Sequence, residues 1–173
     1  MTTQFRFRKG DLVRHPKEAL NWGIGTVLQD STSVDVTVFF ENGGRRNLQL
    51  SFVDLIKVLE PNLEIALKLR IYLNEPFQDI YDDLKSKLPG HLVIIENGTY
   101  FEVLNDDAVV CQKNYGWKIF SRTKNQNLTG FPITQSFQFE RLTKDGLSYV
   151  VVCQIEHGTA EAIPRRVKRV VNC

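Results

Sequence analysis

The first third of the chain alternates apolar and polar residues in short runs, and glycine-rich turns separate these runs. In residues 34–40 the alternation places four apolar side chains on one face of a strand, those of Val34, Val36, Val38 and Phe40. The sequence Asn42-Gly43-Gly44 that follows is typical of a hairpin turn. Further strands are expected at residues 11–14, 25–29, 46–50 and 55–58. This spacing predicts a small all-β barrel or sandwich over residues 1–58.

A helical period replaces the alternation between Pro61 and Asn74, where apolar residues recur every three to four positions. Glu75 precedes Pro76, and a residue in that position disfavours the α conformation, so the helix is expected to end there. We therefore assign residues 59–76 to a helix that connects two domains.

Helices and strands alternate in the remainder of the chain, residues 77–173. Helices are predicted over residues 77–88, from residue 106 onward, and over residues 136–144. Strands are predicted at residues 91–96, 100–104, 117–121, 149–155 and 166–171, and the polar residues 122–129 are assigned to a loop. This order predicts an α/β domain with a mixed sheet and flanking helices. The fold class of the whole chain is therefore mixed α+β.

The composition is that of an ordinary globular protein, with 42% hydrophobic residues and a formal net charge of +2 over 173 residues. There is no overall field for polyanions, so any affinity for nucleic acid must come from local patches. No apolar run approaches the roughly 20 residues that cross a membrane, and the N-terminal residues lack the apolar core of a secretory signal. The three cysteines are widely spaced and odd in number, which favours a reducing cytosol over a disulfide framework. We expect a cytoplasmic protein without membrane association.

The sequence shows no catalytic constellation. Its three histidines lie in different contexts, and none pairs with a nearby cysteine or serine in a recognisable motif. The pairs Asp82-Asp83 and Asp106-Asp107 are explained by the favourable placement of acids early in helices. The ATP-binding pattern Gly-x-x-x-x-Gly-Lys-Ser/Thr does not occur in these residues. We expect no enzymatic activity, no cofactor and no metal site.

The most informative segment is Gly98-Thr-Tyr-Phe-Glu-Val-Leu-Asn-Asp-Asp-Ala108, which predicts a tight turn, a short strand and the start of a helix. Alternation along the strand projects Tyr100 and Glu102 to one side and Phe101 and Val103 to the other. An aromatic ring beside a carboxylate near a turn suggests a contact with another molecule. The alternative is a core strand with an incidental acid.

This segment resembles the Gly-x-Phe-Tyr-Glu signature of the mismatch-recognition domain of MutS proteins, with its trailing Asp-Ala. Three further motifs follow in the family's order. They are Gly130-Phe131-Pro132, the run from Gly146 to Gln154 after a helix, and the basic strand from Arg165 to Val171. The resemblance covers residues 77–171 and implies a MutS domain-I-like mixed sheet with flanking helices.

In that family the signature phenylalanine wedges against a mispaired base from the minor groove, and the glutamate hydrogen-bonds the base. The resemblance therefore implies Tyr100 as the wedge and Glu102 as the base contact. The two aromatic residues are reversed relative to the family, Tyr-Phe in place of Phe-Tyr. Thr99 stands where the family often has a charged residue.

Basic residues near the end of the chain are candidates for phosphate contacts. Arg166 and Lys168 are expected on one face of the last strand, and Arg165 and Arg169 on the other. Arg122 and Lys124 extend the same surface from the predicted loop. The phosphate-binding set is therefore Arg122, Lys124, Arg166 and Lys168. The alternative is that the charges protect a strand edge from pairing with another sheet.

The first domain resembles the Tudor-like barrels at the tail of UvrD/PcrA helicases and the polymerase-binding module of CarD-type regulators. The motifs are Gly10-Asp-Leu-Val-Arg-His-Pro16, Trp22-Gly-Ile-Gly25 and the strand Val36–Glu41. The resemblance implies a barrel that binds mainly protein partners. Trp22, Arg45 and Arg46 are the partner-binding candidates, with the alternative that Trp22 packs over the barrel mouth.

Together these features predict a nucleic-acid-binding accessory protein whose second domain engages mispaired duplex and whose first domain docks a protein. MutS-like accessories of reverse transcriptases in diversity-generating retroelements fit this architecture, and helicases and polymerases are the other candidate partners. The competing hypothesis is a protein-interaction adaptor, or a CarD-like transcription regulator, in which Tyr100 makes no contact with nucleic acid.

Overall fold

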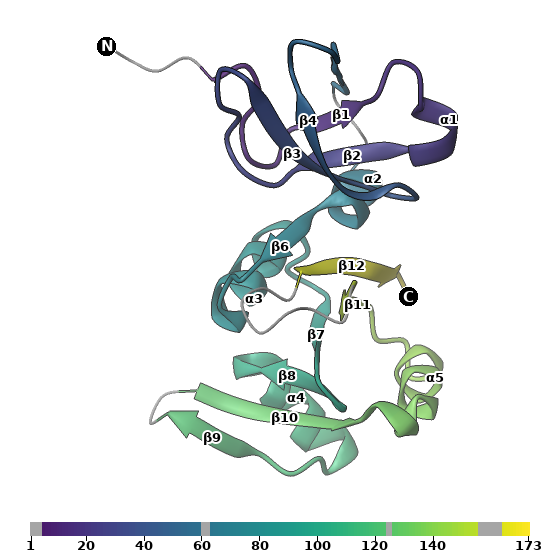
Figure 1. Ribbon diagram of the computed structural model, residues 1–173. Coiled ribbons are helices and arrows are strands. Elements are labelled where there is room, and N and C mark those ends of the chain that lie inside the picture. Colours follow the sequence, from purple (N-terminus) through teal and green to yellow (C-terminus); the bar gives the residue numbers. More distant parts are fainter. Residues whose placement is uncertain (1–4, 60–62, 124–125, 156–163) are drawn as a thin grey trace. The chain divides into compact units, whose positions relative to one another are not determined.

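The computed structural model of this chain describes residues 5–59, 63–123, 126–155 and 164–173, apart from the side chains of Glu64, Arg122 and Thr123 (Figure 1). The chain divides into two compact units, Met1–Leu73 and Asn74–Cys173. Each unit is described by itself below.

The first unit is built on a five-stranded antiparallel sheet in the order β4-β3-β2-β1-β5 (Figure 1). The strands are β1 (Leu12–Arg14), β2 (Ile24–Val27), β3 (Asp35–Phe40), β4 (Gly44–Gln49) and β5 (Ile56–Lys57). A short helix, α1 (Ala19–Trp22), lies between the first two strands, and α2 (Leu63–Leu69) and β6 (Ile71–Leu73) end the unit. The core holds Phe7, Val13, Val27, Val36, Val38, Phe40 and Leu55.

Strand β3 supplies three residues of this core, as the alternating pattern predicts: Val36, Val38 and Phe40. Val34 does not join them and is 64% exposed. The strand begins only at Asp35, and the Val34 N–H in the preceding bend donates to Thr32 Oγ1 at 3.2 Å. Alternation fixes a face only where strand pairing holds the chain extended.

The second unit contains a mixed sheet with its strands in the order β12-β11-β7-β8-β10-β9. These are β7 (Leu92–Asn97), β8 (Tyr100–Leu104), β9 (Phe120–Thr123), β10 (Gln126–Pro132), β11 (Tyr149–Gln154) and β12 (Pro164–Val171). Strands β7 and β11 are parallel, and the other pairs in this order are antiparallel. The helices are α3 (Phe77–Lys87), α4 (Asn105–Tyr115), the 3₁₀ turn η1 (Ile133–Gln135) and α5 (Phe137–Lys144).

The two faces of this sheet carry different side chains. One face holds an aromatic-rich core built of Leu92, Ile94, Val103, Cys111, Trp117, Phe131, Phe139, Leu142, Tyr149, Val151 and Cys153. The other face carries the residues between them on the same strands, among them Ile95, Glu102 and Val152. The mixed α+β fold class expected from the sequence is confirmed, with a five-stranded sheet and two short helices in the first unit and a mixed sheet with helices in the second.

Three expected elements differ in the structure. The connecting helix ends at Leu69 instead of Asn74, and residues 71–73 form strand β6. The loop expected at residues 122–129 is largely strand, because β9 and β10 pair with each other and β10 pairs with β8 (Figure 1). Residues 19–22, for which no element was expected, form α1. In β10 the polar Thr129 is buried, and its hydroxyl donates to Lys118 O at 2.9 Å, so polarity alone gave the wrong assignment.

Candidate nucleic-acid interface

The candidate wedge residue lies at the start of a tight hairpin. Strands β7 and β8 pair from Asn97–Tyr100 to Ile94–Val103, and Gly98 between them has a φ of 59°. This left-handed conformation favours glycine at the turn. Tyr100 is the first residue of β8, and its side chain is 51% exposed. The hairpin therefore presents an aromatic ring at its tip.

The neighbouring aromatic residue points the other way. The Phe101 ring lies 5.4 Å from that of Phe131 and 5.0 Å from that of Phe139, within the aromatic core. Of the two adjacent rings, Tyr100 is thus the one offered to solvent. The reversal of the aromatic pair changes the chemistry of the exposed ring but leaves an aromatic residue at that position.

Glu102 shares the face of Tyr100 but is only 9% exposed. Its Oε1 accepts a hydrogen bond of 2.8 Å from Asn97 Nδ2, across the hairpin. Backbone partners lie on both sides, Ile95 in β7 and Gly130 in β10. The carboxylate is held at the base of the hairpin, while the ring of Tyr100 is accessible.

Gly130 permits the close approach of β10 to β8 at this position. A β-carbon built on Gly130 would lie 2.1 Å from the backbone oxygen of Phe101 and 3.2 Å from the Cα of Glu102. Any larger residue would have to displace the strand that carries Tyr100 and Glu102. The Gly130-Phe131-Pro132 motif continues into η1, where Ile133 N donates to Thr99 O at 3.0 Å.

Strand β12 carries the basic run and contains a bulge. Val151 pairs with Arg169 and Val152 with Val167, so the register skips Lys168. The expected alternation, with Arg165 and Arg169 on one face, is therefore wrong, because one extra residue shifts every side chain beyond it. Arg169 packs over the Phe139 ring at 5.6 Å, on the aromatic face.

The basic residues of β12 also differ in accessibility. Lys168 and Arg169 are exposed, Arg166 is half-buried, and Arg165 is only 8% exposed. Arg122 lies in β9 with its side chain outside the described part of the structure, and Lys124 lies outside the described residues. The structure thus offers Arg166 and Lys168 to solvent.

A family model described as MutS domain I matches residues 75–172, more than half of the chain. The chain belongs to the MutS domain I family. Membership points to DNA binding of the mismatch-recognition kind. A second model, described as a protein of unknown function (DUF3553), matches residues 7–58. No curated protein matches the chain. The likeness of the first unit to Tudor-like barrels stays a prediction.

In the first unit, Trp22 ends α1 and is half-buried in a cluster of rings. Its ring centroid lies 4.7 Å from that of His15 and 5.2 Å from that of Phe40, and the Arg46 guanidinium lies 5.4 Å above it. Gly43 makes room for this packing, since a β-carbon there would lie 2.7 Å from Trp22 Cγ. The indole therefore packs against the core of the first unit and also contacts Arg46. Arg45 lies beside it on β4 and is exposed.

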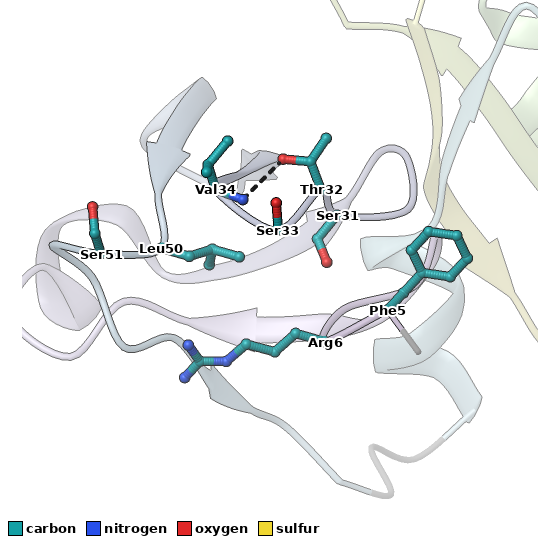
Figure 2. Close-up of a pocket in the computed structure, with 8 residues that line it drawn as sticks. All are labelled: Phe5, Arg6, Ser31, Thr32, Ser33, Val34, Leu50 and Ser51. Carbon is teal, nitrogen blue, oxygen red and sulfur yellow. Dashed lines mark hydrogen bonds between the residues drawn. The ribbon is translucent and has the colours of Figure 1, made fainter. Parts of the chain in front are cut away.

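A shallow pocket of about 470 Å³ opens elsewhere on the first unit (Figure 2). Hydroxyl groups of Ser31, Thr32, Ser33 and Ser51 surround it, together with Phe5, Arg6, Val34 and Leu50. Arg6 is paired with Asp54, and Ser31 Oγ accepts the N–H of Phe7 at 3.1 Å. These contacts tie the pocket to the fold of the unit, and sequence patterns gave no indication of it.

Two of the three thiols, those of Cys111 and Cys153, are buried. Burial raises the pKa of Cys111 to about 12 and that of Cys153 to about 12, whereas Cys173 is exposed. A thiol with so high a pKa is not a nucleophile at neutral pH. Within the described residues, no group of three or more histidine, cysteine or acidic side chains is arranged to hold a metal ion. None of the described helices is long and apolar enough to cross a membrane.

Three residues at the site received no such role from the sequence: Asn97, Gly130 and Arg165. Asn97 could have been found from the hairpin, because it faces Tyr100 across the turn. Gly130 stood in a family motif, but its contact with Phe101 depends on a strand that was not expected. Arg165 was placed with the surface cations, and nothing in the basic run marks it as buried.

Proposed function

We propose that this chain is a non-catalytic accessory protein that binds mispaired or distorted duplex, either DNA or an RNA–DNA hybrid. Tyr100 is the wedge that stacks on a base, and Glu102 is the hydrogen-bond acceptor for that base. The observation that carries the proposal is the half-exposed ring of Tyr100 at the tip of the β7–β8 hairpin in a MutS domain I.

The physical basis is the balance between stacking and unstacking. A base stacked on an aromatic ring gains about 1–3 kcal/mol, and the ring tolerates any base. Opening a base step costs a few kcal/mol and costs least where pairing is already defective. A single exposed ring is therefore enough to favour a mispaired step over a matched one. The tyrosine hydroxyl adds the need for a hydrogen-bond partner once the ring is buried.

The basic residues Arg166 and Lys168 supply phosphate contacts in this proposal, and Arg122 and Lys124 extend them. The first unit docks a protein through Trp22, Arg45 and Arg46, and a reverse transcriptase of a diversity-generating retroelement is the proposed partner. The exposed cations on β4, beside a packed indole, support a surface that meets an acidic partner. The 173 residues carry no ATP-binding loop, which is why the proposal is limited to binding.

The test is the affinity of the full chain for matched, mismatched and RNA–DNA duplexes of one length. Tyr100→Ala is expected to lower affinity for mismatched duplex by about 1–3 kcal/mol and to leave matched duplex nearly unchanged. Tyr100→Phe should keep most of the preference. Phe120→Ala is the matched control, since Phe120 is 55% exposed on β9, with β10 between it and β8.

A second candidate function is a protein-interaction adaptor, a CarD-like regulator included, in which Tyr100 contacts a protein. It is favoured by the charge of the second unit, which has twelve acidic and twelve basic residues and so no net attraction for a polyanion. The same measurement separates the two functions. If Tyr100→Ala leaves the affinity for all three duplexes unchanged, the wedge is wrong and the adaptor is favoured.

A further inference from the structure

A carboxylate at a duplex interface poses an electrostatic problem. Glu102 belongs to a hairpin proposed to meet nucleic acid, and Glu96 lies across the same hairpin, where it pairs with Phe101. Two negative charges beside phosphates raise the free energy of binding unless a nearby cation compensates them. The exposed cations Lys168 and Arg169 lie on β12, which is separated from β8 by β11 and β7.

Among the described residues, Arg165 is a cation in position to compensate Glu102. It pairs with Gln154 in β11 and lies two residues from Val167, on the face that carries Ile95 and Glu102. Its side chain crosses toward β7, where Nε donates to Glu96 O at 3.4 Å, and its guanidinium lies 4.7 Å from the Phe77 ring. Burial lowers the pKa of Arg165, and the charges of Glu96 and Glu102 act in the opposite direction. Glu102 thus shares a face of the sheet with this guanidinium, whereas Glu96 is contacted through its backbone oxygen.

Asn97 holds Glu102 from the other side, with its amide 2.8 Å from Oε1. We infer that Arg165 and Asn97 are positioning residues that hold Glu102 as a charge-compensated hydrogen-bond acceptor for the mispaired base. The inference rests on the proposed function and adds two residues to it. A carboxylate accepts hydrogen bonds and does not donate them, so a site held in this way favours bases that present an N–H group.

This role differs from a phosphate contact in a measurable way. A cation that pairs with a phosphate releases counterions, and its removal flattens the salt dependence of binding by about 0.9 per charge. Arg165 is 8% exposed, and its Nε donates to the backbone oxygen of Glu96 in the hairpin. Its removal should therefore leave the salt dependence of binding unchanged. Its removal should instead lower the ratio of mismatched to matched affinity.

The experiment measures that ratio and the salt slope for the full chain carrying Arg165→Gln, Glu102→Gln or both. Arg165→Gln is expected to lower the ratio about tenfold, the effect of one charge-assisted hydrogen bond, and to have no further effect beside Glu102→Gln. Arg166→Gln is the matched control and should flatten the slope while keeping the ratio. Additive effects of the two substitutions, or a flatter slope for Arg165→Gln, would overturn the inference.

Two further measurements keep the result decisive. Asn97→Ala removes a hydrogen-bond donor without changing the charge. It should lower the ratio of mismatched to matched affinity even where Arg165→Gln fails to fold, and an unchanged ratio counts against the inference.

A double-mutant cycle tests the pair of Arg165 and Glu102 without nucleic acid. It compares the urea midpoints of unfolding of Arg165→Gln, Glu102→Gln and the double variant with that of the wild-type chain. Independent midpoint shifts would refute the pairing and leave the proposed function standing. A wild-type chain without mismatch preference would refute the proposed function, and the positioning role with it, even where the midpoints are coupled.

Discussion

Gly130 shapes the strand of the proposed wedge from the neighbouring strand. It pairs with Glu102, and a β-carbon at this position would lie 2.1 Å from the backbone oxygen of Phe101. Backbone cannot yield to such a contact as a flexible side chain can, so the two strands must move apart.

Gly130→Ala is therefore expected to lower the free energy of unfolding by about 1–3 kcal/mol, the cost of an overpacked site. It should also weaken mismatch binding, because β8 carries both Tyr100 and Glu102. Urea denaturation and duplex titration measure the two effects. Gly90→Ala is the control, since a β-carbon there would meet nothing within 4 Å, and equal effects of both substitutions would contradict the argument.

For single residues, the sequence predicted which face of a strand some side chains occupy. Alternation correctly separated Tyr100 and Glu102 from Phe101, because β8 pairs on both sides and stays regular. The same reasoning was wrong for Arg165 and Arg169, because a bulge in β12 lies between them. Periodicity reports the face of a residue but not how deeply the residue is buried. That is why the exposure of Tyr100 and the burial of Glu102 required the structure.

At the scale of elements, Asp107 links α3, α4 and β7. It lies in the first turn of α4 and is 4% exposed; its Oδ1 accepts from Lys85 Nζ in α3 at 2.9 Å. Its Oδ2 accepts from the backbone N–H of Val93 in β7 at 2.8 Å. Burial raises the pKa of Asp107, and the hydrogen bonds from Lys85 and Val93 act against that rise. The sequence suggested only a helix-start role for this acid.

We expect Asp107→Ala to cost about 1–3 kcal/mol of unfolding free energy, because the buried N–H of Val93 and the ammonium of Lys85 both lose their acceptor. Asp106→Ala should cost about 0.3–1 kcal/mol, since Asp106 is exposed and acts mainly on the helix dipole. Chemical denaturation of the two variants side by side makes the comparison. A cost for Asp106→Ala as large as that for Asp107→Ala would show that the helix start dominates.

Elements were predictable from sequence where their pattern was strong. Residues 77–88 match α3 closely, because apolar residues recur at helical spacing and a proline precedes them. Strand β10 was missed because Gln126, Asn127 and Thr129 are polar and show no hydrophobic pattern. Pairing with β8 and β9 forms this strand through backbone hydrogen bonds, which the sequence pattern does not show. Strand β6 was missed because its apolar residues continue the helical period of α2.

For the whole molecule, the fold class followed from the change of period near residue 60, and each unit has its own apolar core. What the sequence could not supply was the distribution of roles between the units. The first unit has ten basic and eight acidic residues, and the second has twelve of each. The net positive charge thus belongs to the unit that is proposed to bind protein.

This distribution leads to a test of how the two units divide their roles. Replacing both Arg45 and Arg46 by glutamine is expected to leave the affinity for duplex and its salt slope unchanged, because these cations serve a protein partner. Replacing both Arg166 and Lys168 should weaken all duplexes alike and flatten the slope by about one unit per charge. Titrations of the full chain from low to high salt compare the two double variants. A flatter slope for the Arg45 and Arg46 variant would show that the first unit also binds phosphate. In that case its charge would attract duplex generally, while the neutral second unit would retain the preference for mispaired steps.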